Sequence, residues 1–287
     1  MCCSDKVLAS PEYPSTMAES KIRIWKSLRR EVEEMADREP ILASFLYATV
    51  LNHPSLEEAI SFLLASKLAS ATIHSITLRD VMFKAHQEDS TIADAGVADL
   101  VAVRDRDPAA SRGYSQPFLY FKGFHSLQTY RIAHHLWKKG RRELALHLQS
   151  RMSEIFAVDI HPAARIGRGI LMDHGTGVVI GETAVVEDNV SILHEVTLGG
   201  TGKHGGDRHP KIRKGCLISV GAKILGNIEI GEGAKVGGGA VVLSDVAPHT
   251  TVAGIPAKPV GVVKGSASRD MDQTFTETQT FYDGNGI

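Results

Sequence analysis

The stretch "IRKGCLISVGAKILGNIEIGEGAKVGGGAVVLSDVA", residues 212–247, repeats with a period of six residues. Isoleucine or valine opens every unit, and a small residue commonly stands near the fifth position. A short repeat with an obligatory aliphatic residue is typical of a solenoid, because each unit can bury its hydrophobic side chain only against neighbouring units. Three such units close one triangular coil with the aliphatic residues stacked inside. The stretch therefore predicts a hexapeptide parallel β-helix.

The same period extends upstream and is first interrupted beside "MDHGTG", residues 172–177. Units open at Ile160, Ile166 and Met172, but the next well-formed unit opens only at Ile180, so two residues are extra. The interruption coincides with an aspartate and a histidine, which suggests that regular packing gives way there to functional side chains.

A second interruption lies between Leu198 and Ile212. These residues are fourteen apart, two more than a pair of units, so the segment "TGKHGGDRHP" (201–210) cannot lie flat in the coil. Its three glycines, two histidines, arginine and proline suit an exposed loop. A loop on a rigid scaffold is a common place for binding residues, so we expect it to belong to the site.

Residues 21–155 follow a helical pattern instead. The first segment has an apolar stripe at three- and four-residue steps, formed by Ile22, Trp25, Leu28 and Val32. Ser55 stands three residues before Glu58, which predicts a capping box at the start of a helix. A further helix is predicted from Pro117 to a basic last turn before Gly140.

The two patterns predict an α+β chain of two domains. An all-α domain covers residues 21–155, and a β-helix covers residues 156–263. Residues 1–20 and the polar, aperiodic residues 264–287 are expected to be a flexible N-terminus and a flexible C-terminal tail.

Composition excludes several classes of protein. The 32 basic and 33 acidic residues nearly cancel, so a nucleic-acid partner is not indicated. No stretch approaches the roughly 20 apolar residues that span a bilayer, and the N-terminus lacks the pattern of a secretory signal. Three cysteines cannot form a disulfide framework here, and Cys216 is expected to be a buried core residue. A cytoplasmic protein is therefore expected.

Four stretches resemble the serine acetyltransferase family: "RDRDPA" (104–109), "KGFHSLQTYRIAHHLW" (122–137), the segment 159–215, and "AGIPAKPVG" (253–261). "MDHGTG" together with "GGTGKHGGDRHPK" (199–211) is specific to that family. The resemblance runs from about residue 21 to 263. It implies a left-handed β-helix and an enzyme that transfers acetyl from acetyl-CoA to L-serine, the first step of cysteine biosynthesis in bacteria and plants.

The resemblance also implies which residues form the site. His174 corresponds to the catalytic base, and Asp159 to its carboxylate partner. The residues implied to surround L-serine are Asp107 and Asp173 at the amino group, Arg208 at the carboxylate, and His209 as a second histidine that takes part in catalysis.

Acetyl-CoA is implied to bind as a co-substrate in the groove between neighbouring solenoids of a trimer, and no cofactor or metal is implied. The candidate contacts are Gly200, Thr201, Val220, Ala222 and Lys235. Two positions depart from the common family pattern. Gly175 stands where alanine is frequent, and Val220 is bulkier than the residue usual near the pantetheine.

Further partners are implied by the same resemblance. L-cysteine is expected to occupy the serine site as a feedback inhibitor. A homotrimer or a dimer of trimers is expected. The terminal Ile287 matches the residue with which family members bind O-acetylserine sulfhydrylase, and a polar tail ending in one apolar residue and a carboxylate suits a peptide ligand.

The chemistry of acetyl transfer fits these residue types. A serine hydroxyl is a poor nucleophile unless a base removes its proton, and histidine suits that role near neutral pH. An acceptor on the second ring nitrogen would fix the tautomer. Fifteen residues separate Asp159 from His174, close to the 18 of one coil, so the two can meet on adjacent coils. Because the substrate supplies the nucleophile, no acyl-enzyme is needed.

The substrate's charges are matched too. Two carboxylates suit an ammonium group, and the planar fork of Arg208 suits a carboxylate. Because Asp107 comes from the helical domain, the site is expected where that domain meets the solenoid.

Other interpretations remain open. A hexapeptide acetyltransferase for a sugar or antibiotic hydroxyl would use the same histidine chemistry. Zinc could bind through His174, His194 and His209, as in other β-helix enzymes. A non-enzymatic assembly protein would use mainly the tail. His134 and His135, on an apolar helix, are expected to be packed or surface residues.

Overall fold

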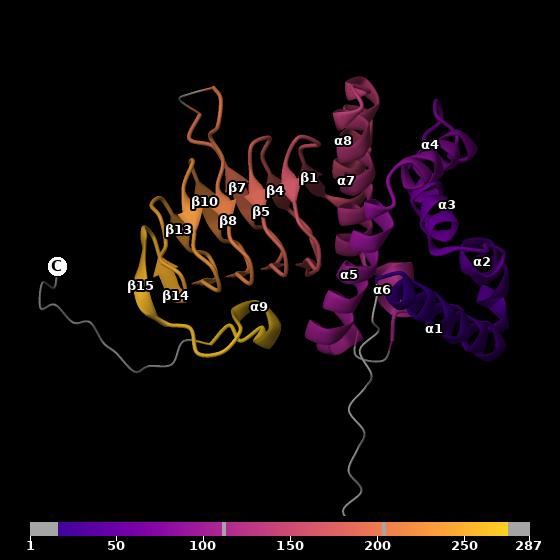
Figure 1. Cartoon of the computed structure of the whole chain (residues 1–287), viewed down its shortest axis with the longest axis horizontal. Helices are drawn as coiled ribbons and strands as arrows, with labels where there is room; N and C mark the ends of the chain where they lie inside the picture. The colour runs from indigo at the N-terminus through magenta and orange to yellow at the C-terminus, as the bar shows by residue number, and fades with distance from the viewer. Residues whose placement is uncertain (1–16, 111–112, 203–204, 275–287) are drawn as a thin grey trace, which may run out of the picture.

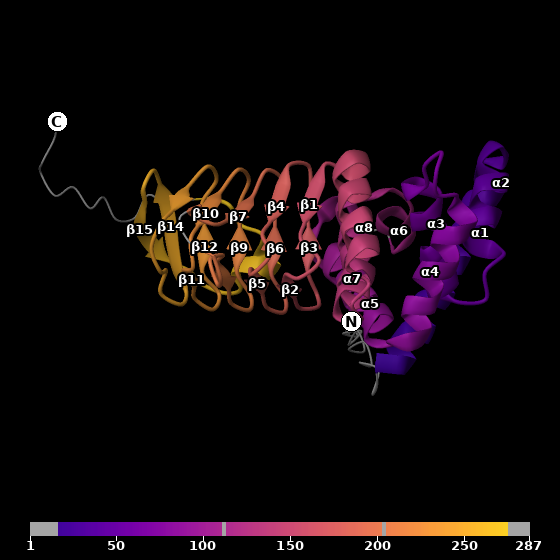
Figure 2. The ribbon, with the colours of Figure 1, turned by 90° about the horizontal axis from the view of Figure 1, so that it is seen from above.

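A computed structural model describes residues 17–110, 113–202 and 205–274, and shows a helical part followed by a β-helix along the long axis of the molecule (Figures 1 and 2). The helical part consists of α1 (Met17–Arg38), η1 (Pro40–Leu42), α2 (Ala43–Leu46), η2 (Tyr47–Leu51), α3 (Leu56–Leu68), α4 (Ser75–Glu88), α5 (Thr91–Arg106), η3 (Pro108–Ala110), α6 (Ser115–Tyr120), α7 (Lys122–Lys138) and α8 (Arg142–Phe156). One hydrophobic core continues from these helices into the β-helix.

The predicted cap of α3 is confirmed, because the Ser55 hydroxyl accepts a hydrogen bond from Glu58 N at 3.3 Å. The apolar stripe of α1 is partly wrong: Ile24, rather than Ile22, shares the buried face with Leu28, and Ile22 is 56% exposed. Ile24 lies four residues before Leu28 and therefore shares its face of the helix, whereas Ile22 lies six residues before it and points to another side.

The single helix predicted over 117–140 is also wrong. The chain breaks at Phe121, whose ψ of 108° is not helical, and forms α6 and α7. Both helices pack on α5, but their other partners differ, since α6 packs on α1 whereas α7 packs on α8 and the β-helix. Apolar periodicity continues through the break and therefore hides it.

The β-helix confirms the fold predicted from the six-residue period. Its strands stack into face A (β1-β4-β7-β10-β13), face B (β2-β5-β8-β11) and face C (β3-β6-β9-β12-β14-β15). The bounds are β1 (Val158–Ile160), β2 (Arg165–Ile166), β3 (Leu171–Met172), β4 (Val178–Ile180), β5 (Val185–Val186), β6 (Ser191–Ile192), β7 (Thr197–Gly199), β8 (Lys211–Ile212), β9 (Leu217–Ile218), β10 (Lys223–Leu225), β11 (Glu229–Ile230), β12 (Lys235–Val236), β13 (Val241–Val242), β14 (Thr250–Gly254) and β15 (Ala257–Val262). Ile180, Leu198 and Ile224 are in register on face A and fully buried, so the repeat's aliphatic residues do form the core.

Three corners join the faces. The first corner leads from face C to face A and includes turns 173–177, 193–196 and 219–222. The second corner leads from face A to face B and includes turn 181–184 and the loop residues 200–202 and 205–210, which stand out from the coils in Figure 1. The third corner leads from face B to face C and includes turns 167–170, 187–190, 213–216 and 231–234.

A buried ion pair fixes the helical part to the first coil. Asp99 on α5 is fully buried, and Arg131 on α7 donates to both its carboxylate oxygens at 2.7 and 3.0 Å. Each partner also reaches the third corner: Arg131 donates to Gly167 O (2.7 Å), and Asp99 accepts from Ile170 N (2.9 Å). Removing one member of such a pair typically costs about 3–5 kcal/mol, so this junction holds the strand that enters the site.

The far end of the β-helix has a different construction. Strand β15 pairs with β14 in the antiparallel direction, whereas the other strand pairs of the described β-helix are parallel. The segment from 264 on, expected to be a flexible tail, contains α9 (Ala267–Asp270) with Ala267 and Ser268 buried. Its contacts use small residues and backbone groups, including a hydrogen bond from Ser268 N to Gly215 O at 3.2 Å. Such contacts leave no apolar period in the sequence.

Two smaller expectations concern composition. Cys216 is fully buried in the β-helix, as predicted, and burial raises the pKa of its thiol to about 12. Within residues 17–110, 113–202 and 205–274, no helix has the length and apolarity needed to cross a bilayer.

Candidate active site

The first-corner turn 173–177 presents His174 to solvent. His174 has a φ of 55°, in the left-handed region that residues with a side chain rarely adopt, and its side chain is 74% exposed. The backbone holds the turn, since Gly177 N donates to Ala157 O at 2.7 Å. Because the imidazole takes no part in holding the turn, it remains available to a ligand.

Two carboxylates from different domains face this histidine. Asp173 Oδ1 lies 3.7 Å from His174 Nε2, and Asp107 follows the last residue of α5. Burial raises the pKa of Asp173, and the like charge of Asp107 raises it further, whereas His174 and His194 lower it. Asp107 and Asp173 therefore share one negative region beside His174, where an ammonium group would fit.

His194 completes this cluster and lies one coil beyond His174. Met172 and Ile192 are in register on face C, and each histidine follows its strand residue by two positions. The two rings meet edge to face, with centroids 5.7 Å apart. His194 Nδ1 is buried and has no hydrogen-bond partner among the described residues. His194 was expected only as a ligand in the zinc alternative, although its third position in "ILHEVT" matches that of His174 in "MDHGTG".

Two glycines allow α7 to approach the turn closely. A Cβ on Gly123 would lie 2.1 Å from Met172 O, so only glycine fits at that point of α7. Gly175 has a φ of 74°, and a Cβ there would lie 3.1 Å from Gly123 Cα. The departure from alanine at Gly175 thus suits a left-handed residue packed against a helix.

Asp159 lies at the centre of β1 on face A, opposite Val179. Its Oδ1 accepts a hydrogen bond of 2.7 Å from Gln149 on α8. The carboxylate that contacts His174 among the described residues is that of Asp173. Pairing between Asp159 and His174 therefore stays a prediction, and it would require the exposed imidazole to turn towards face A.

The second corner carries His209, which is only 7% exposed. Its Nδ1 accepts a hydrogen bond from Thr183 N at 3.1 Å and lies 2.8 Å from Thr183 Oγ1. Accepting at Nδ1 leaves the ring proton on Nε2. Burial lowers the pKa of His209, and Arg208 and Lys211 lower it further. His209 is thus a neutral, fixed hydrogen-bond donor.

Arg208 lies beside His209 and is already paired. Its Nη2 donates to Glu182 Oε2 at 2.8 Å, and its backbone N donates to Thr183 Oγ1 at 3.0 Å. This hydrogen bond from Arg208 lowers the pKa of Glu182. A substrate carboxylate at Arg208 would have to share the guanidinium with Glu182 or replace it.

Face A separates the two corners. The first corner leads into β4 and the second corner leads out of it. A face six residues long at about 3.3 Å per residue is roughly 15–20 Å wide. Within one chain, the structure therefore brings Asp107, Asp173 and His174 together at the domain junction and keeps Arg208 and His209 apart from them.

The residues proposed for acetyl-CoA are divided in the same way. Gly200 and Thr201 belong to the second corner, whereas Val220 and Ala222 belong to the first. The Ala222 side chain is fully buried, so only its backbone can contact a ligand. Lys235 lies on face C, where its ammonium donates to Thr274 O at 2.7 Å. No single groove of one chain holds all five.

The remaining histidines of the sequence analysis have other surroundings. His134 Nδ1 lies 2.7 Å from Pro162 O, and His135 Nε2 lies 3.1 Å from Glu88 Oε2. The three histidines of the zinc alternative are split, with His174 and His194 at the first corner and His209 at the second.

Comparisons with known proteins agree with this architecture. A family model described as the N-terminal region of serine acetyltransferase matches residues 24–129. A model of the bacterial transferase hexapeptide, six repeats long, matches residues 209–244. The serine acetyltransferase of Salmonella typhimurium is 56% identical over 266 residues, which cover 92% of this chain and 97% of that protein.

Solved structures are similar along both domains. A serine acetyltransferase in complex with cysteine is 51% identical, with a TM-score of 0.87, over 89% of this chain and 100% of that one. Soybean serine acetyltransferase complexed with serine is 57% identical, with a TM-score of 0.82, over 84% and 99%. The Brucella abortus serine acetyltransferase in complex with coenzyme A is 52% identical, with a TM-score of 0.83, over 85% and 97%.

A helical domain joined to a hexapeptide β-helix, with an exposed histidine at their junction, defines the hexapeptide-repeat acyltransferases as the class of this protein. Within this class, the chain shares more than half of its residues with a serine acetyltransferase over nearly its whole length. The chain belongs to the serine acetyltransferase family.

Proposed function

We propose that this chain transfers the acetyl group of acetyl-CoA to the hydroxyl of L-serine, with His174 as general base. The observation that carries the proposal is the convergence of an exposed histidine with Asp173 and Asp107 at the domain junction. Solved relatives complexed with serine and with coenzyme A support the two substrates.

The reaction requires one proton to move twice. His174 takes the hydroxyl proton while the serine oxygen attacks the thioester carbonyl, and a tetrahedral intermediate forms. The C–S bond then breaks, and the thiolate receives the proton from the imidazolium. The products are O-acetyl-L-serine and CoA, and no acyl-enzyme forms because the substrate supplies the nucleophile. A positioned base typically contributes about 10²–10⁴-fold.

The other side chains have binding and positioning roles in this proposal. Asp107 and Asp173 hold the ammonium group of L-serine, and Arg208 holds its carboxylate. His209 donates from Nε2 to an oxygen of the substrate or of the intermediate. Asp159 accepts from the imidazole of His174 when that ring turns towards face A, and so stabilises the imidazolium.

We propose that the complete site forms between two chains of a trimer, where the first corner of one chain meets the second corner of its neighbour. The separation of His174 from His209 by a whole face supports this arrangement. The same groove would receive acetyl-CoA, since Gly200 and Thr201 lie at one corner and Val220 and Ala222 at the other. A homotrimer, alone or paired as a dimer of trimers, satisfies this geometry.

Regulation and partners extend the proposal. L-cysteine differs from L-serine in the single atom at the reacting position, and a relative has been solved with cysteine; we propose that it competes for the serine site as a feedback inhibitor. Binding of O-acetylserine sulfhydrylase through Ile287 stays a prediction, because Ile287 lies outside the described residues. A cytoplasmic location belongs to the same proposal.

The test is release of CoA thiol from acetyl-CoA with L-serine, for the unmodified chain and for His174→Ala. Serine-dependent release that the substitution reduces by roughly 10²-fold or more supports both reaction and base. L-cysteine is added to the unmodified enzyme with a readout that does not detect thiols. Release with a sugar or another hydroxyl acceptor, but not with L-serine, would retain the class of enzyme and reject the substrate.

A further inference from the structure

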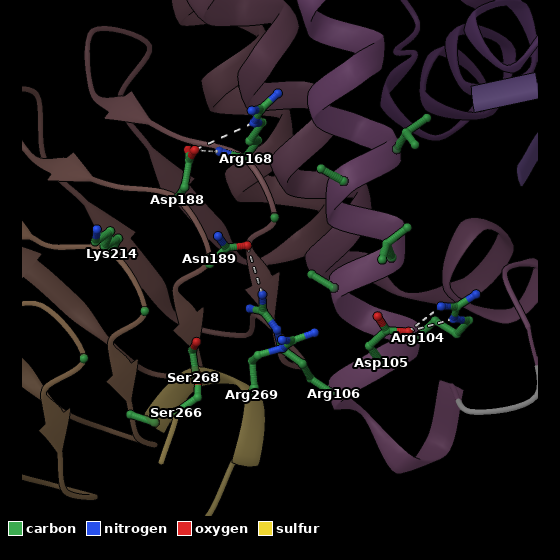
Figure 3. Close-up of a pocket in the computed structure, with 18 of the residues that line it drawn as sticks. Arg104, Asp105, Arg106, Arg168, Asp188, Asn189, Lys214, Ser266, Ser268 and Arg269 are labelled. Atoms are coloured by element: carbon green, nitrogen blue, oxygen red, sulfur yellow. Dashed lines mark hydrogen bonds and ion pairs between the residues drawn. The ribbon is translucent and has the colours of Figure 1, made fainter. Parts of the chain in front are cut away.

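A cavity of about 860 Å³ lies at the third corner, on the edge of the β-helix that face A does not touch (Figure 3). Helix α5 forms one wall, the turns around Asn189 and Gly215 form another, and α9 closes it. Its position separates it from both His174 and His209, and the proposed reaction makes no use of it.

The charges that line this cavity do not balance. Six basic side chains and three acidic ones line it. Each acidic group already has a basic partner, in the pairs Arg104–Asp105 at 2.5 Å, Arg168–Asp188 at 3.7 Å and Lys214–Glu232 at 3.2 Å. Three cations, Arg23, Arg106 and Arg269, are left without a carboxylate partner among the described residues. Of these, Arg106 and Arg269 lie close enough to interact electrostatically.

Arg106 is the deeper of these two cations and is only 9% exposed. Its guanidinium donates to neutral acceptors, the Ser191 hydroxyl at 3.2 Å and Asn189 Oδ1 at 3.4 Å. Burial lowers the pKa of Arg106 to about 10, and the charge of Arg269 contributes to that. Figure 3 shows the two guanidinium groups side by side. Burying a positive charge beside a second positive charge raises the free energy of the folded protein unless an anion binds between them.

Ser268 adds a neutral donor to the same cavity. The residue is fully buried, and its hydroxyl has no hydrogen-bond partner among the described residues. Its backbone is fixed, because Ser191 Oγ donates to Ser268 O at 2.8 Å. Ser191 therefore connects Ser268 to Arg106, and the hydroxyl and both guanidinium groups converge on one region (Figure 3).

We propose that this cavity binds a small oxyanion, a phosphate or sulfate group, between Arg106 and Arg269, with Ser268 as an additional donor. Two unpaired guanidinium groups match a dianion, and their planar forks suit tetrahedral oxygens. The volume exceeds that of a bare ion, so the group can belong to a small organic phosphate. The site is independent of the acetyl-transfer reaction.

The test is calorimetric titration of the full-length protein with inorganic phosphate and with sulfate at constant ionic strength, first without CoA and then with saturating CoA, which fills the proposed acetyl-CoA groove. The decisive variant is Arg269→Gln, because Arg269 is exposed and its loss should not unfold the chain. The matched control is Arg168→Gln, a cation of the same cavity that is already paired. We expect Arg269→Gln to weaken binding by roughly tenfold or more and Arg168→Gln by less than about twofold.

Two further arms identify the source of the group and the role of the buried cation. Titration with AMP tests a phosphate monoester, and binding tighter than that of the free ion indicates an organic ligand. Arg106→Lys keeps the charge but loses the fork, and we expect weaker binding with an unchanged melting temperature in the absence of the anion. Equal weakening by Arg269→Gln and Arg168→Gln, or no saturation by any of the three ligands, overturns the proposal.

Discussion

The first and second corners each carry a histidine of the proposed site, yet they are built in opposite ways. His174 has a left-handed backbone conformation and a side chain that is 74% exposed, and its imidazole lies beside Asp173 and the ring of His194. His209 is 7% exposed and held at Nδ1 by Thr183. The first corner leaves its imidazole exposed and free to turn, whereas the second corner fixes the tautomer and the direction of its imidazole.

This difference corresponds to the two roles that acetyl transfer needs. A base must lose and regain a proton, and therefore gains from exposure and a nearby carboxylate. A donor to developing negative charge gains from a fixed position that needs no reorganisation during reaction. Neither corner reaches the other within one chain. In the proposed trimer, the two corners would therefore be complementary half-sites contributed by neighbouring chains.

The largest effect is expected from mixing two inactive chains. His174→Ala removes the first half-site and His209→Ala the second, so each variant alone should be nearly inactive. Co-expressed chains that assort randomly would leave about a quarter of the shared sites intact in a cyclic trimer. Activity of the purified hetero-oligomers, assayed by thiol release, measures this. No recovery in a confirmed mixed trimer would mean that each site lies within one chain.

Gly181→Ala should damage the second corner while sparing the first. The added Cβ would lie 2.0 Å from His209 Nε2, so the ring must leave its position. We expect a loss of about tenfold or more in kcat, consistent with misplacement of a fixed donor. The control is Gly205→Ala in the neighbouring loop, where an added Cβ meets nothing within 4 Å. Equal kcat values for the two variants would contradict a role for His209.

Asp107→Ala tests the substrate side of the first corner. Loss of a charge-assisted contact to the ammonium group should raise KM for L-serine by roughly tenfold. KM for acetyl-CoA should change little, because Asp107 belongs to the helical domain. Steady-state kinetics with each substrate varied in turn separate the two effects. A parallel rise in both constants would point to a structural role.

The smallest effect concerns the titration of His209. Because burial lowers the pKa of His209 below its ordinary value of about 6.5, the unfolded chain binds this proton more tightly than the folded chain. His209 thus stabilises the fold above about pH 6.5, and that contribution is lost as the pH falls below it. Ring-proton NMR, with His209→Gln for assignment, should show a neutral ring with the proton on Nε2 at pH 7. A pKa above 6.5 would contradict the fixed neutral donor.

Much of the β-helix could be predicted because its order is local. Isoleucine or valine recurs at Ile212, Ile218, Ile224 and Ile230, and each occupies an equivalent buried place in successive faces. The helical part was less predictable. The break at Phe121 depends on where α6 and α7 find partners, and these partners are distant in the sequence. Apolar periodicity indicates that one face of a helix is buried, but it does not indicate which element packs against that face.

The same contrast between local and long-range order decides which parts of the candidate site could be predicted. The neighbourhood of Asp173 and His174 followed from the interrupted repeat, and Asp107 followed from family resemblance alone. The split between His174 and His209 depends on which corner each occupies. To assign each histidine to a corner from the sequence, the six-residue units must be counted in groups of three, one group for each coil. The two interruptions disturb that count because they add residues outside the regular period. The cluster around Arg106 left no motif, because its members come from α5, the β-helix and α9.

The antiparallel strand β15 has a consequence for assembly. A stack of parallel coils resembles a template, because its last coil offers unpaired backbone groups to the first coil of another molecule. Here α8 lies over β1 at one end, and β15 folds back over β14 at the other, reversing the strand direction. An incoming coil therefore meets a helix or a strand of the wrong polarity. The two covered ends therefore oppose end-to-end growth of the repeat into a fibre, and they leave the sides of the β-helix for the proposed trimer contacts.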